Sequence, residues 1–465
     1  MKTNNRIQKA MFQEMQEQSI FDKAQKYAMH YLEEVFDRNV SPTDKAIDNL
    51  AHFEQDLQTE SSNGSEILDL LQKYGSPATT AQLGGRYFGF VNGSVVPVGL
   101  AAKNLATYWD QNPAMHVLSP IASTLETVVE KWLVELFGLP ERTVAGFLSG
   151  TSTANFSALA AARYRILKRQ GWDINEQGLF DAPKIRIVTG KQAHSTILKA
   201  ISLLGFGKNN IEWVAVDDQG RIIPDELPEL DDKTIVILQA GNVNTGSFDA
   251  FDEICKKANM ANAWVHIDGA FGLWAGAVAA LKHRTKGMEK ANSWAVDGHK
   301  TLNTPYDSGI VLCEDKEALV SALHMAGSYL VLTDRDGMFY TPEMSRRARI
   351  IELWAVMKYL GKSGIDEMIL GMHERTKQFA SAFKANGFEV MNEVVFNQVM
   401  IRCVTDDLTV KTMESVQNSG ECWAGGAVWE GKKVIRISVC SWATTSEDVT
   451  RSVAAFVAAR EALKN

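Results

Sequence analysis

Hydrophobic and polar positions divide the chain into three stretches with different rhythms. From Phe21 to Leu57 apolar residues recur at helical spacing, and a helix stop followed by a helix start at 41–44 separates two helices. The polar run 58–64 indicates a surface loop, and a further helix follows at 66–73. No strand pattern occurs here, so we predict a helical N-terminal segment, residues 1–85, that packs on another domain or on a partner subunit.

A second rhythm begins at Ser123, where short apolar runs alternate with helical stretches. The strand-like runs lie at 144–148, 185–189, 213–216, 234–239, 264–268, 294–297 and 309–313, and the helices at 123–137, 153–168 and 195–204. Such alternation is typical of an α/β layer with a mainly parallel sheet, whose ligands bind at the carboxyl ends of the strands. We therefore predict a large α/β domain over residues 86–345 that carries the ligand site.

After Met344 the pattern changes again, to long helical stretches and a few short strand-like runs. The helices lie at 347–360, 365–385 and 446–463, and the strands at 388–390, 398–403 and 434–439. This order predicts a smaller α+β domain over residues 346–465.

Composition narrows the functional class only slightly. The 465 residues are 45% apolar and 22% charged, as in a soluble globular protein, and the net charge of −8 argues against nucleic-acid or anionic-membrane partners. The five cysteines include no CxxC pair, which disfavours a disulfide framework or a zinc knuckle. Residues 1–19 lack the apolar core of a signal peptide, and no run is long enough to span a bilayer, so we expect a cytoplasmic protein.

Candidate chemistry lies at four predicted strand ends. Segment 149–155 follows the first strand and opens a helix, so its N–H groups and the helix dipole favour a small phosphate, with an ordinary hydroxyl N-cap as the alternative. His194 lies just past the second strand, where a structural histidine is the alternative. In segment 266–270 the carboxylate of Asp268 needs a cation if it is buried. Metal binding by His266 and Asp268 is a weak rival, because no third ligand lies nearby in the sequence.

The fourth strand end lies in the stretch 293–309, where an apolar run stops at Asp297-Gly298 and is followed by His299 and Lys300. Desolvation in an apolar setting lowers the pKa of a lysine, and the neutral amine then forms Schiff bases. For this residue alone, a surface lysine after a turn is the alternative.

Together these groups match what pyridoxal 5′-phosphate requires of a protein. The cofactor needs a phosphate cradle, a carboxylate for its cationic ring nitrogen, flat groups that stack on the ring, and a Schiff-base lysine. The separation of Asp268 and Lys300 leaves room for one crossover helix and the next strand.

The sequence also resembles the group II pyridoxal-phosphate-dependent amino-acid decarboxylases, whose signature is matched by Ser293-Trp294 followed after five residues by Lys300, with His299 before it. The resemblance extends from Phe21 to Ala462, and its strongest points are Ser149–Asn155, His194-Ser195, His266–Gly272 and Ser293–Gly309. It implies an aspartate-aminotransferase-like fold (fold type I of these enzymes) and an obligate homodimer with active sites at the interface.

The resemblance further implies a role for each matching residue. Lys300 would hold the cofactor covalently, Asp268 would pair with the ring nitrogen, and His194 and Ala270 would lie against opposite ring faces. The residues implied to contact the phosphate are Ser152, Thr153 and His299, and Asn242 would lie near the ring hydroxyl.

Further positions concern the substrate. Tyr329, in the polar segment 327–337, would protonate the substrate Cα after carbon dioxide leaves, from a loop that in the family reaches in from the neighbouring subunit; a solvent-exposed loop tyrosine is the alternative. Asn92 is the candidate for holding the substrate carboxylate and Arg347 for shaping that region, with structural roles as the alternatives. Asp297 stands where some relatives have a neutral amide that touches phosphate, so the acid either faces elsewhere or lowers phosphate affinity.

The implied reaction is decarboxylation of an L-amino acid to the amine and carbon dioxide. Transamination, carbon–carbon lyase chemistry and oxidative decarboxylation to an aldehyde are alternatives on the same scaffold, and Tyr329 disfavours the last, because aldehyde-forming relatives tend to carry Phe there. A non-catalytic cofactor-binding protein is disfavoured by intact Lys300, Asp268 and His194, and a metal-dependent hydrolase by the lack of ligands.

The substrate stays open between aromatic, acidic and basic amino acids. Segments 87–97 and 115–120 are expected to line its pocket, and Phe88, Phe90 and His116 in them favour an aromatic substrate slightly.

Overall fold

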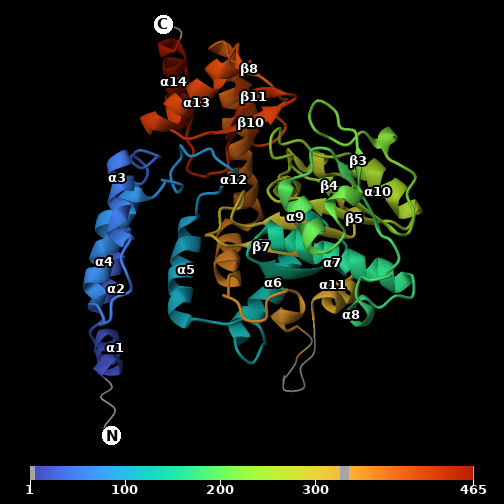
Figure 1. The fold of residues 1–465 in the computed structure, drawn as a ribbon, viewed down its shortest axis with the longest axis horizontal. Helices are drawn as coiled ribbons and strands as arrows, with labels where there is room; N and C mark the ends of the chain where they lie inside the picture. Colours follow the sequence, from blue (N-terminus) through green and yellow to red (C-terminus); the bar gives the residue numbers. More distant parts are fainter. Residues whose placement is uncertain (1–5, 325–332, 334, 464–465) are drawn as a thin grey trace.

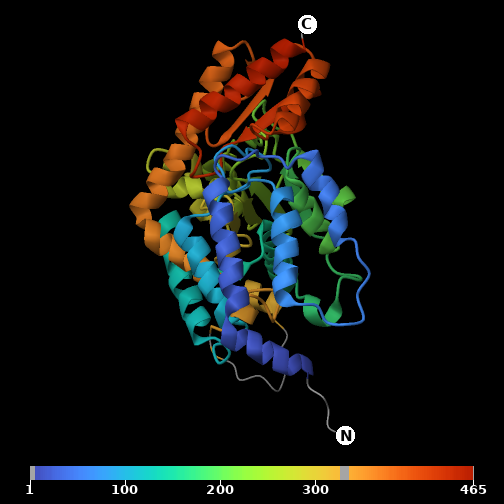
Figure 2. The same ribbon diagram turned by 90° about the vertical axis from the view of Figure 1, so that its left-hand side faces the viewer.

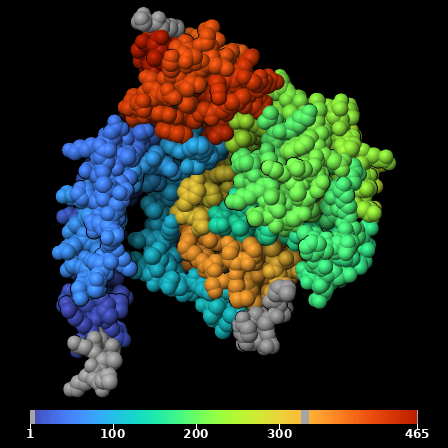
Figure 3. All heavy atoms as spheres, viewed as in Figure 1, coloured from blue at the N-terminus to red at the C-terminus, as the bar shows by residue number. Residues whose placement is uncertain are grey.

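The computed structural model describes residues 6–324, 333 and 335–463, and its first part is a helical arm. Four helices form this N-terminal arm (residues 6–75): α1 (Arg6–Glu17), α2 (Ser19–Glu34), α3 (Asp44–Asp48) and α4 (Gly64–Leu70). The side chains of Thr43 and Asn63 accept hydrogen bonds from the first turns of α3 and α4, which fixes where these helices begin. The arm stands beside the body of the molecule, with a recess between them (Figure 1, Figure 3).

Two helices lead from the arm into the body. α5 (Pro97–Trp109) begins with a proline, and α6 (Pro120–Phe137) begins after Ser119, whose hydroxyl caps its first turn, and ends at Gly138. Both helices pack against α12, described below.

A seven-stranded sheet forms the centre of the body (Figure 1). Its strands are β1 (Val144–Leu148), β2 (Arg186–Gly190), β3 (Ile211–Val214), β4 (Thr234–Gln239), β5 (Trp264–Asp268), β6 (Ser293–Asp297) and β7 (Gly309–Cys313). They lie in the order β1-β7-β6-β5-β4-β2-β3, and only β7 runs against its neighbours. The predicted mainly parallel α/β sheet is therefore confirmed.

Helices cover both faces of this sheet. One face packs on α7 (Thr151–Arg169), α9 (Ser195–Leu203) and α11 (Lys316–Leu323), and the other on α6, α10 (Phe251–Met260) and the first half of α12. Because both faces are covered, the central strands β4, β5 and β6 are buried along their whole length. The remaining short helical segments are α8 (Ile174–Gln177), a π-helical segment at Leu71–Gly75, and 3₁₀ segments at Asn49–Phe53, Ser76–Ala78, Lys208–Asn210, Pro224–Glu226, Gly272–Ala277, Lys282–Thr285, Met288–Lys290 and Gly337–Phe339.

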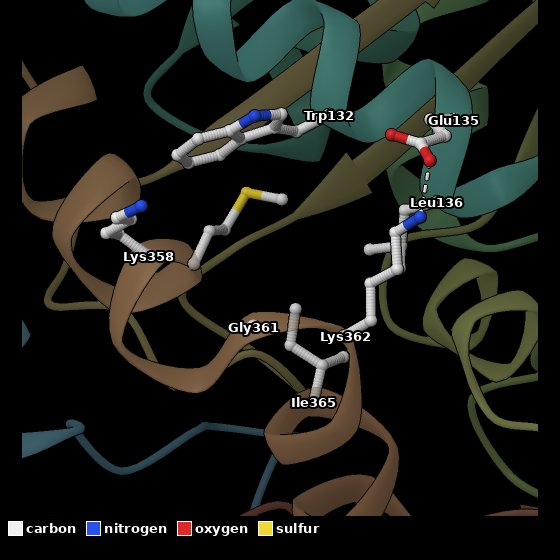
Figure 4. Close-up of a pocket in the computed structure, with 8 residues that line it drawn as sticks. Trp132, Glu135, Leu136, Lys358, Gly361, Lys362 and Ile365 are labelled. Atoms are coloured by element: carbon white, nitrogen blue, oxygen red, sulfur yellow. Dashed lines mark hydrogen bonds and ion pairs between the residues drawn. The ribbon is translucent and has the colours of Figure 1, made fainter.

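A long kinked helix, α12 (Ile350–Ala385), links the body to a second sheet. The kink is at Gly361, whose φ of 58° and ψ of −175° are not helical, and it divides α12 where the sequence predicted two separate helices. A hollow of about 240 Å³ lies beside the kink, where Lys362 forms an ion pair with Glu135 of α6 and Trp132 lies opposite (Figure 4).

The second sheet belongs to a smaller α+β unit at the C-terminal end of the chain (Figure 2). Its elements are β8 (Glu389–Val390), β9 (Gln398–Arg402), α13 (Asp406–Ser419), β10 (Gly425–Trp429), β11 (Lys432–Ser438) and α14 (Ser446–Ala462). The strands are antiparallel, in the order β10-β11-β9-β8, and one apolar cluster joins this sheet to the second half of α12, α13 and α14.

Strand β3 differs from its prediction. It covers Ile211–Val214 rather than 213–216, because Val216 instead forms an isolated antiparallel bridge with Ile222 across a turn. Across the described residues, none of the helices combines the length and the apolar character that a membrane span requires.

Candidate active site

A cavity of about 520 Å³ opens at the carboxyl ends of β1, β5 and β6. Parallel strands bring their carboxyl ends to one edge of the sheet, so residues far apart in the sequence meet there. The predicted cofactor residues that line this cavity are Ser152, Thr153, His194, Asp268, Ala270, His299 and Lys300.

Asp268 ends β5 and is a buried carboxylate, only 5% exposed. One oxygen accepts a hydrogen bond from Nδ2 of Asn155 at 3.2 Å, and the other from the backbone N–H of Ala270 at 3.3 Å. Burial raises the pKa of Asp268, while the nearby charges of His194 and Lys300 oppose this shift. No cation of the described residues lies within ion-pair distance, so this carboxylate faces the cavity with its charge unpaired.

His194 forms the N-cap of α9. Its Nδ1 accepts a hydrogen bond from the backbone N–H of Thr196 at 3.3 Å and lies 2.8 Å from the Thr196 hydroxyl. Because Nδ1 is an acceptor, the neutral ring carries its proton on Nε2. Burial lowers the pKa of His194, which favours this neutral, flat ring at the cavity wall.

Asp297, whose role the sequence left open, faces into the cavity at the start of α7. One carboxylate oxygen accepts the N–H of Thr151 at 2.7 Å, and the other accepts the Thr151 hydroxyl and lies 3.0 Å from Nζ of Lys300. The acid thus caps α7, whose own N-cap residue Gly150 has no side chain, and it pairs with the lysine amine.

His299 lies between Asp297 and a tyrosine. Its Nδ1 accepts the N–H of Ser308 at 3.0 Å, its Nε2 lies 3.6 Å from the Asp297 carboxylate, and its ring stacks on Tyr306 with centroids 4.3 Å apart. The backbone is close-packed here, since a Cβ on Gly309 would lie 2.3 Å from the Cα of Gly150. Only glycine therefore fits where β7 passes the start of α7.

These groups fit pyridoxal phosphate. The unpaired buried carboxylate of Asp268 suits a protonated ring nitrogen, and the flat ring of His194 and the small side chain of Ala270 suit its faces. The first turn of α7 and His299 offer donors for the phosphate, and the amine of Lys300 lies in the same cavity.

Arg436 is a cavity residue that the sequence analysis missed. It lies on β11 of the small sheet, burial lowers the pKa of its guanidinium, and its hydrogen bond is to Oδ1 of Asn244 at 3.4 Å. It makes no ion pair with the described residues, so a positive charge lines the cavity without an acidic partner. The one feature of the sequence that could have indicated a role for this residue is that it is an arginine within an apolar strand.

Phe90 and Val91 form another wall of the cavity. Both have positive φ, 53° and 60°, which is strained for non-glycine residues. Trp423 holds this bend, because its ring packs 5.2 Å from the rings of both Tyr87 and Phe90. Phe90 is 61% exposed and so presents its ring at the cavity mouth.

Three predicted site residues lie outside this cavity. Asn92 donates to the side chain of Gln82 at 3.3 Å, and the Asn242 side chain caps its own turn by accepting the N–H groups of residues 244 and 245. Arg347 binds Asp307 at 2.8 Å and also contacts Glu352.

Two further predictions concern Tyr329 and Phe88. Tyr329 lies outside the described residues. Phe88 is buried against Phe379 in the core of the small sheet rather than in the cavity.

The described residues include no group of His, Cys, Asp and Glu arranged to hold a metal, and both ring nitrogens of His266 contact other side chains, Ser293 and Asn155.

Comparison with known proteins identifies relatives over most of the chain. The family model described as "Pyridoxal-dependent decarboxylase conserved domain" matches residues 53–404. The acidic amino acid decarboxylase GADL1 of Xenopus tropicalis is 28% identical over 324 residues, which are 66% of this chain and 62% of that protein, so the chain spans about three fifths of this relative. The aromatic-L-amino-acid decarboxylase of Bacillus atrophaeus is 26% identical over 424 residues, 85% of each chain.

Solved structures show the same fold. The crystal structure of Oryza sativa TDC with PLP and tryptamine superposes with a TM-score of 0.88 at 22% identity, covering 96% of this chain and 98% of that one. The crystal structure of mouse CSAD gives 0.87 at 19% identity, covering 95% and 98%.

Proposed function

The chain belongs to the pyridoxal-dependent decarboxylase family, whose members are carboxy-lyases that use pyridoxal phosphate, and on this premise we propose that it converts an L-amino acid to the amine and carbon dioxide. The observation that carries the proposal is the convergence of Lys300, Asp268, His194 and the start of α7 on one cavity. Transamination and lyase chemistry share these groups, so they stay as alternatives for the reaction itself.

Each residue of this site has a separate proposed role. When bound, pyridoxal phosphate supplies the electron-accepting ring that takes up the electron pair of the broken bond. Lys300 would supply the amine that holds the cofactor, and Asp268 would keep a proton on the ring nitrogen. His194 would pack on the ring face, and the hydroxyls of Ser152 and Thr153, which line the same cavity, would bind the phosphate. Orientation of the substrate then decides which bond at Cα breaks.

The test is product analysis with the cofactor-loaded protein and a panel of L-amino acids. We expect one amino acid to give its amine with an equal amount of carbon dioxide, and a Lys300→Ala variant to give neither. Release of an α-keto acid without carbon dioxide would instead support transamination.

For the substrate we propose an aromatic amino acid first. The exposed ring of Phe90 and the apolar side chains of Val91, Val243 and Phe271 give the cavity one apolar wall. A flat apolar side chain buries its surface well against such a wall.

Arg436 supports an acidic amino acid as the second candidate. In the transition state of decarboxylation, the negative charge of the leaving carboxylate is dispersing. A cation bound to this carboxylate therefore stabilises the ground state more than the transition state and slows the reaction. The unpaired guanidinium is therefore better used on a second, distal carboxylate. An Arg436→Gln variant that loses activity only with acidic substrates would favour this candidate, and equal losses with all substrates would not.

We also propose that Tyr329 protonates the substrate Cα, on the family resemblance alone. With dioxygen present as the oxidant, a Tyr329→Phe variant is expected to shift the product from amine toward aldehyde and ammonia, and an unchanged amine yield would contradict the role.

A homodimer is proposed as the working form. The N-terminal arm supports this, because no residue of α1 or α2 is buried within one chain. Apolar helix faces of this length need a partner surface.

A further inference from the structure

A line of buried polar side chains lies behind Asp268 and has no role in the site as described so far. It consists of Asn155 on α7, His266 on β5, Ser293 on β6 and Trp264 at the start of β5. Each is at most 2% exposed. Burying polar groups here costs free energy unless each is paired, so their arrangement needs a reason.

The contacts run in one unbroken line to the carboxylate. Nε1 of Trp264 donates to the Ser293 hydroxyl at 3.0 Å, and that hydroxyl lies 3.0 Å from Nδ1 of His266. Nε2 of His266 lies 2.9 Å from Oδ1 of Asn155, and Nδ2 of Asn155 donates to Asp268 at 3.2 Å.

When Asp268 is ionised and the His266 ring is neutral, only one assignment of protons joins a donor to an acceptor at every link. Indole Nε1–H only donates, so Ser293 accepts from Trp264 and gives its own proton to Nδ1 of His266. His266 then carries its proton on Nε2 and donates it to the amide oxygen of Asn155. This turns the amide nitrogen of Asn155 toward the Asp268 carboxylate, where it acts as a donor. Burial lowers the pKa of His266 to about 3, so the ring stays neutral, as this assignment requires.

The opposite assignment carries a cost at Asp268. If Asn155 were reversed, its carbonyl oxygen would face an ionised carboxylate, and two acceptors would meet in a buried site. The line of contacts therefore favours the charged form of Asp268, against the effect of its burial.

Asn155 also reaches the second cofactor contact. Its Nδ2 lies 3.5 Å from the Thr196 hydroxyl, and that hydroxyl lies 2.8 Å from Nδ1 of His194. One amide group thus touches both the carboxylate for the ring nitrogen and the hydroxyl that holds the stacking histidine.

We propose that Asn155, oriented by His266, is a positioning residue that keeps the Asp268 carboxylate ionised and directed at the ring nitrogen of the cofactor. The inference rests on the same cofactor site as the proposed function and deepens it, because it assigns the groups that sustain the charge on which the ring nitrogen depends. It does not depend on which substrate is used or on which product is formed.

The test measures cofactor binding rather than turnover. The cofactor-free full chain is titrated with pyridoxal 5′-phosphate and, in parallel, with 1-deazapyridoxal 5′-phosphate, in which C–H replaces the ring nitrogen. The ratio of the two dissociation constants reports the Asp268–nitrogen contact and cancels effects on the phosphate and on the ring faces. In the unsubstituted protein we expect a preference for the natural cofactor of about tenfold or more.

Asn155→Leu, which removes the amide at similar volume, is expected to lose most of this preference while binding of the deaza analogue changes little. Ser157→Ala is the matched control, because Ser157 is also fully buried on α7 but bonds only within its helix, at 2.8 Å to the carbonyl of Thr153. Equal weakening toward both compounds in Asn155→Leu would show a merely structural role and overturn the proposal, as would an unchanged preference.

Two further substitutions keep the test decisive if Asn155→Leu does not fold. Asn155→Asp keeps the shape and the acceptor for His266 but sets a second carboxylate against Asp268, so the preference should again fall. His266→Gln retains an N–H donor and should keep the preference, whereas His266→Leu should lose it. Identical behaviour of these two His266 variants would contradict the orienting role. Failure of the unsubstituted protein to bind the natural cofactor would overturn the cofactor site as well, whereas binding without decarboxylation would count against the proposed function alone.

Discussion

At the scale of single residues, Asp297 sets the electrostatics of the cavity at the start of α7. Its carboxylate bonds to the first N–H of α7, which is also where a phosphate group would bind, and it pairs with Lys300. A buried negative charge at this point opposes the binding of a second anion.

Replacing Asp297 with Asn should therefore have two opposite effects. Cofactor affinity should rise, on the order of tenfold, because the repulsion of the phosphate is removed. The cofactor-free chain should be destabilised by about 1.5–3 kcal/mol, because charged hydrogen bonds to Thr151 and Lys300 become neutral or are lost. Spectroscopic titration and chemical unfolding measure the two effects.

The same substitution at Asp225, whose side chain is 95% exposed, is the control and should leave both quantities unchanged. Weaker cofactor binding by Asp297→Asn would mean that the carboxylate assists the phosphate site instead of opposing it.

His266 gives the protein a pH dependence of stability with a definite sign. Burial lowers the pKa of this histidine to about 3 in the folded chain, below the value of about 6.5 in the unfolded chain. Between these values only the unfolded chain binds the proton, so stability is retained above pH 6.5 and is lost as the pH falls. The loss approaches about 1.4 kcal/mol per pH unit once the pH is more than one unit below 6.5.

The His266→Gln variant lacks this titration. The difference in unfolding free energy between the unsubstituted protein and the variant should therefore shrink by about 1 kcal/mol between pH 6.5 and 5.5 and by less between pH 7.5 and 6.5, as measured by urea unfolding at these three values. A difference that is constant with pH would show that the ring is accessible to protons in the folded state.

At the scale of elements, the kink of α12 connects the two sheets. The helix packs on α5 and α6 before Gly361 and on the small sheet after it, so the bend decides how β11, with Arg436, meets the cavity. The φ of 58° with a ψ of −175° is a combination open essentially only to glycine.

Gly361→Ala should thus lower the free energy of unfolding by about 1–3 kcal/mol, through backbone strain alone, since a Cβ there would meet nothing within 4 Å. Gly371→Ala is the matched control, because Gly371 lies in the same helix with regular geometry and equally open space. It should raise stability by about 1 kcal/mol through helix propensity. Equal effects of the two substitutions in chemical unfolding would contradict the strain at Gly361.

At the scale of the whole molecule, the N-terminal arm leaves apolar side chains in solvent. Ile7, Met11 and Met15 follow one another at helical spacing on α1 with Phe12 beside them, and all four are more than half exposed. A face of this kind gains stability only when another surface covers it, and we propose that this surface belongs to the second copy of the chain.

Phe12→Glu should accordingly weaken self-association by about tenfold or more, because a buried phenyl ring contributes roughly 1.5–3 kcal/mol. Sedimentation over a range of protein concentrations measures the dissociation constant. Gln16→Glu adds the same charge at an exposed polar position of α1 and should leave association unchanged. Unaltered association of Phe12→Glu would place the subunit contact elsewhere.

The sequence by itself determined the features that depend on neighbouring residues. Apolar runs that end in turns located β1, β4, β5 and β7 to the residue, because strands buried on both faces consist mostly of apolar residues. The ends of β5 and β6 pointed to Asp268 and Lys300, since the carboxyl ends of parallel strands meet at one edge.

Local pattern was weaker in the C-terminal unit. It did not single out α13 or β10, because a partly exposed strand that begins with two glycines and a mostly polar helix carry little apolar periodicity. Phe88 was expected at the pocket for its residue type, and only the packing of the small sheet assigned it to the core.

Tertiary structure decided everything that depends on residues distant in the sequence. Three such features are the contact of Asp297 with the start of α7, the position of Arg436 of the second sheet in the cavity, and the contact between Asn155 and Asp268. Each brings together segments that no local sequence pattern relates. The physical reason is that a side chain's charge and proton arrangement are set by what surrounds it after folding. The sequence names the chemical groups, whereas their partners, and hence their charge states and roles, are fixed only when the chain folds.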